Sequence, residues 1–250
     1  MIEVVNLVKS FGETTVLNDI TATFEPGKVN MVIGASGSGK TTLTKCIVGL
    51  HEVNSGKVMY DGAPFSEMKF RERKEIRTKI GFLFQGSALF DSLTVEENIG
   101  FPLRVFTNQS KEEISERVDF CLDRVNLSHT HKLLPAELSG GMKKRVGIAR
   151  AIAMNPRYLF CDEPNSGLDP QTSILIDQLI HEITQEFGMT TIVISHDMNS
   201  VIEIGDKVIF LHKGHLWWEG DRKTILKTEN QEILDFVYAS KFMQQFRNAN

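Results

Sequence analysis

The segment Gly34–Thr42 carries the residue types that bind nucleotide phosphates. It reads Gly-Ala-Ser-Gly-Ser-Gly-Lys-Thr-Thr and matches the pattern G-x-x-x-x-G-K-T. Glycines let backbone N–H groups approach phosphate oxygens without side-chain clashes, and a following helix N-terminus adds positive potential. The pattern predicts that Lys40 reaches the β- and γ-phosphates and that the Thr41 hydroxyl binds Mg²⁺. The predicted nucleotide-binding residues of this segment are Gly34, Ser36, Gly37, Ser38, Gly39, Lys40, Thr41 and Thr42.

Two carboxylates follow an apolar segment further along the chain. Tyr158–Cys161 is typical of a buried strand, and Asp162 and Glu163 come directly after it. Asp162 would then lie where Mg²⁺ sits, and Glu163 can orient and polarise an attacking water. A simple pair of charges at a strand end is the alternative. The apolar strand and the position about 120 residues after the phosphate loop argue against it.

Phe11 lies in a Ser-Phe-Gly turn between two segments of alternating apolar and polar residues. An exposed aromatic ring there could stack on a purine base. A turn aromatic that closes a small core is an equally good interpretation of the residue by itself.

The elements that must position these residues alternate between apolar strands and amphipathic helices. A strand, the glycine loop and a helix over 41–48 follow one another, which favours a phosphate loop over an ordinary glycine turn. Leu43, Cys46, Ile47 and Leu50 have helical spacing, and Gly49 can end that helix. Mixed charges predict a solvent-exposed helix over 69–79. The expected strands are 2–8, 14–24, 31–33, 57–60, 80–84, 158–161, 190–194, 208–211 and 216–218.

The middle of the chain has a different character. A capping box at Ser110 and Glu113 starts an amphipathic helix, and Leu138–Met142 opens another. Asp169 and Pro170 begin a further helix that Gly188 ends. The pattern predicts a helical subdomain inserted over about 86–155.

Composition restricts the class of protein. The chain has 250 residues, 41% hydrophobic and 24% charged, which is ordinary for a globular protein. A net charge of −4 and a pI near 6.0 argue against nucleic acid as the main partner. The three cysteines lack metal-ligand spacing and suit a reducing compartment. We expect no signal peptide and no membrane span, so a membrane role would place the spanning part in another polypeptide.

Taken together, these motifs resemble the nucleotide-binding subunits of ATP-binding cassette (ABC) transporters over about residues 2–225. Further matches are the Q-loop glutamine, the signature segment usually written Leu-Ser-Gly-Gly-Gln, the D-loop and the switch histidine; in this chain they are Gln85, Leu138–Met142, Ser166–Asp169 and His196. Phe11 matches the aromatic residue that stacks on adenine. The resemblance implies an α/β fold of the P-loop NTPase class, with an ABC ATPase core, an antiparallel β subdomain and the helical insertion. We expect this domain to occupy 1–229 and an amphipathic helical tail to occupy 230–250.

The resemblance also implies a mechanism with ATP and Mg²⁺. Two copies would face head to tail, and each ATP would be held by one copy's phosphate loop and by the partner's Ser139, Gly140 and Gly141. Glu163 would be the general base or water-orienting group, and His196 would contact the γ-phosphate. Gln85 would sense Mg²⁺ and signal to the membrane partner, and Asp169 would bridge the copies. The implied metal ligands are Thr41, Gln85 and Asp162.

One departure points to a subfamily. Met142 stands where the family usually has glutamine, and the string Leu-Ser-Gly-Gly-Met resembles the ATPases of Mla-type lipid transport systems. The strings over 84–95 and 162–170 resemble the same group. This resemblance implies phospholipid transport between bacterial membranes, separate transmembrane permease subunits, a lipid-binding substrate protein and a cytoplasmic position on the inner face of the membrane. The alternatives are an ABC transporter ATPase for another solute and a soluble ATPase of iron–sulfur cluster assembly.

Two further apolar features concern partners. Phe90 and Leu93 follow Gln85, so they are candidates for the wall of a groove that receives a permease helix, or else they fill the subdomain interior. The tail has an apolar stripe at helical spacing, formed by Phe236, Ala239, Phe242, Met243 and Phe246. That stripe can pack on its own domain or on the second copy.

Overall fold

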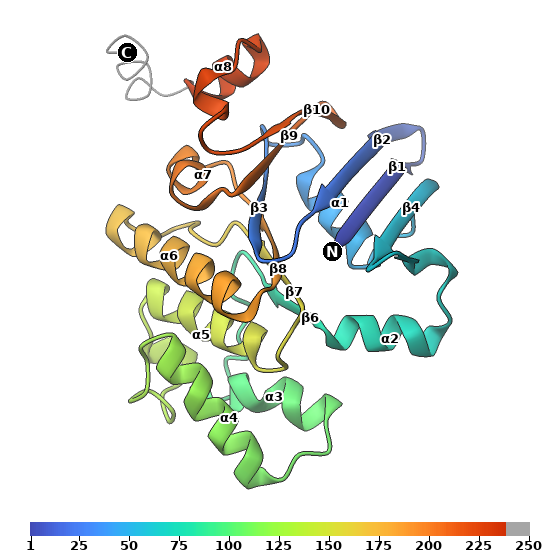
Figure 1. Ribbon diagram of the computed structural model, residues 1–250. Coiled ribbons are helices and arrows are strands. Elements are labelled where there is room, and N and C mark those ends of the chain that lie inside the picture. The colour runs from blue at the N-terminus through green and yellow to red at the C-terminus, as the bar shows by residue number, and fades with distance from the viewer. Residues whose placement is uncertain (239–250) are drawn as a thin grey trace.

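The computed structural model describes residues 1–238, which form two β-sheets with helices around them (Figure 1). The larger sheet has the strand order β10-β9-β3-β8-β7-β6, and the smaller has the order β2-β1-β4-β5. The strands are β1 Ile2–Phe11, β2 Thr14–Phe24, β3 Lys28–Ile33, β4 Ser55–Tyr60, β5 Ala63–Pro64, β6 Ile80–Leu83, β7 Tyr158–Asp162, β8 Thr190–Ile194, β9 Lys207–His212 and β10 His215–Gly220.

The burial pattern of each strand explains its pairing. β1 and β2 alternate buried and exposed residues and pair antiparallel, as predicted. β3, β7 and β8 are apolar runs buried on both faces, and they pair in parallel with their neighbours. The predicted hairpin around Lys213 and Gly214 is confirmed by the antiparallel pairing of β9 with β10.

The α-helices are α1 Lys40–Ile47, α2 Phe70–Thr78, α3 Val95–Phe106, α4 Lys111–Arg124, α5 Gly140–Ile152, α6 Pro170–Phe187, α7 Met198–Ile204 and α8 Gln231–Val237, and short 3-10 turns are η1 Phe65–Glu67, η2 Pro135–Glu137 and η3 Ile225–Lys227. The predicted caps are confirmed: the Asp169 side chain accepts from the Thr172 N–H at the start of α6, and Gly188 ends this helix at φ 59°. The predicted capping box of Ser110 and Glu113 starts α4.

Two apolar cores lie on opposite faces of the larger sheet. Met31 and Ile33 of β3 join the core formed with α3, α4, α5 and α6. Val32, between them, joins the core formed with α1 and the smaller sheet. The two-residue alternation of one buried strand therefore holds both layers together. In Figure 1 the helices α3, α4 and α5 lie at the end of the molecule away from β1 and β2.

The predicted end of α1 at Gly49 is confirmed, because the helix ends at Ile47 and Gly49 adopts φ 73°. A side chain at Gly49 would meet the ring of Phe65, so the chain must turn at this glycine. Leu50 lies beyond the turn and is 65% exposed.

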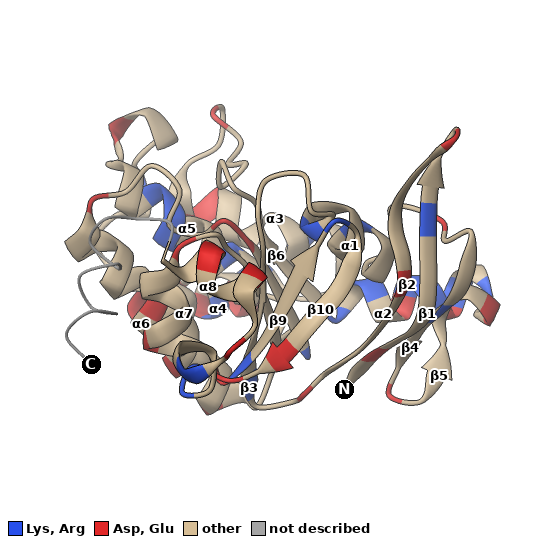
Figure 2. Ribbon diagram, turned by 90° about the horizontal axis from the view of Figure 1, so that it is seen from above, with Lys and Arg blue, Asp and Glu red and all other residues tan. Residues whose placement is uncertain are grey.

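Charged residues are spread over the molecule. None of the residues of α2 is buried, which confirms the predicted solvent-exposed helix. Figure 2 shows Lys and Arg interspersed with Asp and Glu over helices and strands rather than collected on one face.

The described part of the tail begins with α8. Ile233 and Val237 are buried, and the ring of Phe236 lies 5.3 Å from that of Phe210 in β9. Of the predicted stripe, Ala239, Phe242, Met243 and Phe246 lie outside the described residues. No helix within 1–238 combines the length and the apolar character needed to cross a bilayer.

Candidate functional site

Four neighbouring parallel strands end at one edge of the larger sheet. Gly34 follows β3, His196 comes two residues after β8, Asp162 ends β7, and Gln85 comes two residues after β6. Because the carboxyl ends of parallel strands lie at the same edge, the fold brings together residues that are far apart in the sequence. Glu163, next to Asp162, belongs to the same group.

The phosphate loop requires its glycines. Gly34, Gly37 and Gly39 adopt φ of 146°, 78° and 104°, which other residues rarely adopt. A side chain on Gly34 would place its Cβ 2.2 Å from the carbonyl oxygen of Leu211. Ala35, Ser36 and Gly37 are exposed, so the middle of the loop is open to a ligand.

The start of α1 has unsatisfied donors. Its N-cap, Gly39, offers no side-chain cap, whereas Thr94, Ser110, Ser139 and Asp169 cap α3, α4, α5 and α6 with their side chains. Free N–H groups at a helix N-terminus bind anions. The Ser38 hydroxyl is also buried without a hydrogen-bond partner. These donors fit a polyphosphate.

Lys40 is held inside the loop. Its Nζ donates to the carbonyl oxygens of Gly34 at 2.8 Å and Ala35 at 3.0 Å, and its side chain is largely buried. Burial lowers the pKa of this amine, an effect that the charges of Glu163 and Asp162 oppose. A cation held by carbonyl oxygens at the loop is placed to bind phosphate oxygens.

Glu163 and His196 form a pair. The Nδ1 of His196 lies 2.9 Å from Oε1 of Glu163, and the histidine side chain is 69% exposed while that of Glu163 is only 16% exposed. Glu163 has φ 48°, an unusual conformation for a residue other than glycine. A carboxylate beside an open histidine can hold and orient a water molecule.

Asp162 and Gln85 lie beside this pair. Burial raises the pKa of Asp162, and the neighbouring charge of Glu163 raises it further, while Lys45, Lys40 and Lys144 lower it. The Nε2 of Gln85 donates to the Ser166 hydroxyl at 3.4 Å. Thr41 is exposed at the start of α1.

These residues suit Mg²⁺ better than an all-protein metal cage. Within residues 1–238, no group of three or more His, Cys, Asp or Glu side chains could hold a metal ion. Mg²⁺ at a nucleotide typically takes one or two protein ligands, and phosphates and water supply the rest. One carboxylate, one hydroxyl and one amide fit that pattern.

Phe11 lies near the phosphate loop through the β1–β2 hairpin. Lys9, two residues before it, pairs with Leu17, and a Cβ on Gly39 would lie 2.6 Å from the Leu17 side chain. The Phe11 ring is 46% exposed and meets the ring of His51 edge-on at 5.2 Å. One face of the ring is covered by Lys9, whose Nζ lies 4.7 Å from the ring centroid.

The predicted residues of the signature segment lie elsewhere. Ser139 caps α5 by accepting from the Met142 N–H, and Ser139 and Gly140 are exposed. A Cβ on Gly141 would lie 2.5 Å from the Thr172 side chain, so this segment sits against the start of α6. The structure therefore brings together the loop, Asp162, Glu163, His196 and Gln85, and it leaves Ser139 and Gly140 exposed at the start of α5.

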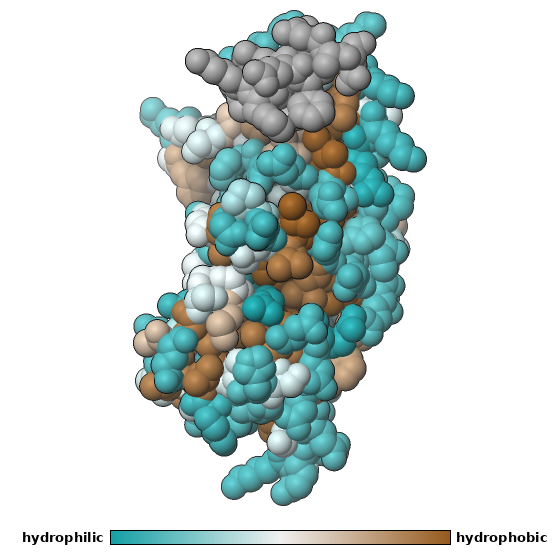
Figure 3. All heavy atoms as spheres, turned by 90° about the vertical axis from the view of Figure 1, so that its left-hand side faces the viewer, coloured by the Kyte–Doolittle hydropathy of each residue, from teal (hydrophilic) through white to brown (hydrophobic). Residues whose placement is uncertain are grey.

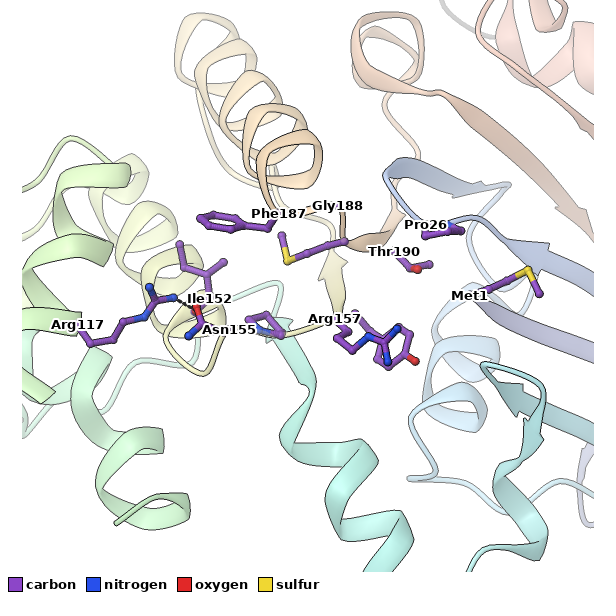
Figure 4. Close-up of a pocket in the computed structure, with 12 residues that line it drawn as sticks. Met1, Pro26, Arg117, Ile152, Asn155, Arg157, Phe187, Gly188 and Thr190 are labelled. Atoms are coloured by element: carbon purple, nitrogen blue, oxygen red, sulfur yellow. Dashed lines mark hydrogen bonds between the residues drawn. The ribbon is translucent and has the colours of Figure 1, made fainter. Parts of the chain in front are cut away.

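A separate cavity lies at the opposite edge of the sheet (Figure 4). It has a volume of about 230 Å³ and is lined by Tyr158 and Thr190, the first residues of β7 and β8. The side chain of Arg117 donates to the carbonyl oxygen of Ile152 beside it. None of the predicted site residues lines this cavity, so it is not the nucleotide site.

Sequence reasoning missed Lys144. This residue of α5 is only 4% exposed, and its Nζ donates to the carbonyl oxygen of Gln85 and, at 3.3 Å, to that of Glu163. Lys144 lies four residues before the buried Ile148 and therefore on the apolar face of the same helix. A lysine at such a position is unusual, and this pattern could have identified it from the sequence.

Comparison with known proteins gives one family. Residues 17–166 match the family described as ABC transporter. A protein of Mycobacterium bovis named "Probable ribonucleotide transport ATP-binding protein mkl" is 37% identical over 236 residues, covering 94% of this chain. This chain spans 66% of the length of that relative.

Two solved structures are similar. A dimeric structure of the ATP-binding cassette MJ0796, described as a post-hydrolysis state with ADP and Pi, has a TM-score of 0.79 at 33% identity and covers 89% of this chain and 99% of its own. The structure of cbiO1 from Clostridium perfringens, described as part of the transporter complex cbiONQ, has a TM-score of 0.85 at 29% identity and covers 98% of each chain.

Proposed function

Because this chain belongs to the ABC transporter family, we propose that it is the subunit that binds and hydrolyses ATP to drive a membrane transporter. The observation that carries the proposal is the shared sheet edge. There the open phosphate loop, Asp162 and the pair of Glu163 and His196 lie at the ends of neighbouring strands. This arrangement places the phosphate-binding loop, a carboxylate for Mg²⁺ and a group that can orient water at one edge of the sheet, as phosphoryl transfer to water requires.

In the proposed reaction, the loop and α1 bind the phosphates of ATP. The N–H groups of the loop and the Nζ of Lys40 bind phosphate oxygens and stabilise the negative charge that builds up during transfer. Thr41, Asp162 and Gln85 would hold Mg²⁺, which supplies charge neutralisation at the β- and γ-phosphates. Phe11 would stack its free ring face on adenine.

Glu163 and His196 would then act on the attacking water. The carboxylate of Glu163 accepts a proton from this water or holds it in line with the γ-phosphate. His196, whose ring contacts that carboxylate, is exposed enough to reach a γ-phosphate oxygen as well. The proton that Glu163 accepts has a route to the exposed imidazole.

We also propose that the complete site needs a second copy. Ser139, Gly140 and Gly141 lie at the exposed N-terminus of α5, a position suited to anion binding, and Gly141 packs against Thr172 at the start of α6. The dimeric state of the similar MJ0796 cassette supports the pairing. Asp169 caps α6 beside this segment, and it would lie between the copies.

The proposed membrane partner is a separate permease. A hollow of about 410 Å³ beside β6 and α3 is lined by exposed aromatic rings, among them Phe84, Phe90 and Phe101. Phe90 is thus available to a partner helix, whereas Leu93 is half-buried and does not line the hollow. The similar cbiO1 belongs to a transporter complex, which supports such an assembly. The chain would then sit peripherally on the cytoplasmic face of the membrane, without nucleic acid as a partner.

For the cargo, we propose phospholipid, with a lipid-binding substrate protein in the system. The support is the string Leu138–Met142 and the strings over 84–95 and 162–170, which resemble the Mla-type ATPases. Transport of another solute is the second candidate, since the mycobacterial relative is named for ribonucleotide transport.

Phosphate release from ATP tests the proposal. The purified chain with its co-purified permease should release phosphate in an Mg²⁺-dependent manner, and Lys40→Ala should abolish this while Lys74→Ala, a change in an exposed lysine of α2, should not. A chain that releases no phosphate in any assembly contradicts the proposed activity. Lipids that co-purify with the complex, identified by mass spectrometry, decide between phospholipid and another solute.

A further inference from the structure

Lys144 contacts both strand ends that carry the proposed hydrolytic residues. Its side chain is buried in α5, and its Nζ bonds the main-chain carbonyls of Gln85, after β6, and Glu163, after β7. Figure 1 shows that α5 lies alongside these strands. A buried ammonium group needs acceptors, and both of these acceptors belong to the backbone of residues at the site.

Glu163 depends on such contacts for its conformation. With φ at 48°, a residue that has a side chain is held in place by its surroundings. The Glu163 N–H donates to the carbonyl oxygen of Ile194 at 2.9 Å, and its carboxylate contacts His196. The carbonyl oxygen of Glu163 accepts from the Ser166 N–H at 3.1 Å and from the Nζ of Lys144 at 3.3 Å. Of these partners, Lys144 is the one that lies on α5.

Arg150, a second cation on α5, makes similar contacts with the segment that follows Gln85. Arg150 donates to the carbonyls of Ser87 at 2.6 Å and Ala88 at 2.7 Å, and these two residues also have positive φ, 61° and 46°. Gly147, between Lys144 and Arg150, allows the close approach, because a Cβ there would lie 2.7 Å from the Leu83 side chain. Thus α5 holds the backbone over 85–88 and at Glu163 through charge-assisted hydrogen bonds.

On this basis, and resting on the proposed function, we propose that Lys144 is a positioning residue for ATP hydrolysis. It fixes the main chain that aims the carboxylate of Glu163 and the amide of Gln85. It also links them to α5, the helix whose N-terminus carries Ser139–Gly141 to the second copy. A shift of α5 when the partner's nucleotide engages its N-terminus would therefore move the hydrolytic residues of the same chain.

The test compares Lys144→Met with Arg145→Met. Arg145 lies on the same helix and also donates to main-chain carbonyls, those of Val125 at 3.1 Å and Asn126 at 3.3 Å, which are away from the site. Lys144→Met should lower kcat at least tenfold with KM changed less than threefold, and Arg145→Met should change kcat less than twofold. Lys144→Gln, which keeps a neutral donor, gives a milder variant if the methionine variant does not fold, and its kcat should fall in between.

Two further measurements separate positioning from stability alone. In a Glu163→Gln background, Lys144→Met should lower the remaining rate less than twofold, because groups that act through one another are not additive. In the nucleotide-free protein, amide hydrogen exchange over 84–88 and 162–166 should rise at least tenfold in Lys144→Met and stay unchanged in Arg145→Met.

Unchanged exchange in these segments, a kcat loss that multiplies with that of Glu163→Gln, or equal kcat losses for Lys144→Met and Arg145→Met would each overturn the inference. If the wild-type chain releases no phosphate, the proposed function fails, and the exchange measurement still decides whether Lys144 holds the two segments.

Discussion

At the scale of single residues, Glu163 concentrates most of the chemistry that the site can perform. It is largely buried, it holds an unusual backbone conformation, and it contacts the exposed His196. A carboxylate next to an open position is suited to accept a proton from water. Asp162, one residue earlier, lies where burial and the charge of Glu163 raise its pKa, so a bound cation would favour its ionised form.

Replacing Glu163 by Gln tests this role. The amide keeps the size and the hydrogen-bonding capacity of the side chain but cannot accept the proton, so kcat should fall by about 10²–10⁴ while ATP still binds. The dimer should be trapped in its closed form, which size-exclusion chromatography with ATP would detect. Steady-state hydrolysis within threefold of the wild-type rate contradicts a role for Glu163 in the chemical step.

Asp177 gives a prediction for pH. Burial raises its pKa from 3.8 to about 6, against the lowering effect of Ser200 and Asn165, and one of its carboxyl oxygens has no hydrogen-bond partner. Since the folded state holds this proton more tightly than the unfolded state, the stabilisation is present at low pH and is lost as pH rises through about 6.

The variant Asp177→Asn removes this titration. Urea unfolding measures the free energy of unfolding of both proteins at pH 4.5 and at pH 7.5. The difference between the variant and wild type should shift in favour of the variant by about 2 kcal/mol from the lower to the higher pH. Glu182→Gln, an exchange at an exposed carboxyl group of the same helix, serves as the control. An identical pH dependence for Asp177→Asn and wild type would show that Asp177 ionises normally in the folded state.

At the scale of elements, α5 belongs to two sites. Its N-terminus is exposed and capped by Ser139, whereas its middle holds the chain's own Gln85 and Glu163 through Lys144. The exposed end is the part that a second copy could use, because the N-terminus of a helix is suited to anion binding.

The composite site predicts complementation. Ser139→Arg should abolish hydrolysis while leaving ATP binding by the separate subunit intact, because the bulky cation blocks only the site of the other copy. Mixed with Lys40→Ala, which cannot bind phosphate normally, it should regain phosphate release through the one complete site of the heterodimer. Normal hydrolysis by Ser139→Arg alone would instead place the entire site in one chain.

The same elements show what the sequence could predict. Strand ends, caps and the phosphate loop follow from local patterns, because each rests on residues within a few positions of one another, as at Asp169 and Gly188. The role of Lys144 could not be predicted this way, since its acceptors lie 59 and 19 residues away. The exposure of Leu50 does not follow from helical spacing, which says nothing about the contact of Phe65 with the turn at Gly49.

At the scale of the whole molecule, exposed apolar side chains gather on one face. Figure 3 shows hydrophobic side chains gathered over the middle of the face that lies on the left of Figure 1, where α6 and α7 are found. Ile174 and Leu175 of α6 are 46% and 62% exposed. A hollow of about 1120 Å³ on this face is lined by Ile174, Leu226 and Tyr238 among others. Tyr238, which lines this hollow, is the last described residue.

Two truncations test what the tail does. A chain that stops after Glu229 loses the buried Ile233 and Val237 and the contact of Phe236 with Phe210, so its stability should fall by about 3 kcal/mol or more. A chain that stops after Tyr238 keeps α8 but loses Ala239, Phe242, Met243 and Phe246. Most amphipathic helices pack on their own domain, so we expect this second truncation to lower the melting temperature of the monomer and to leave nucleotide-free association unchanged in light scattering. If the shorter protein melts like the full chain but no longer dimerises without nucleotide, the apolar stripe of the tail packs on the second copy instead.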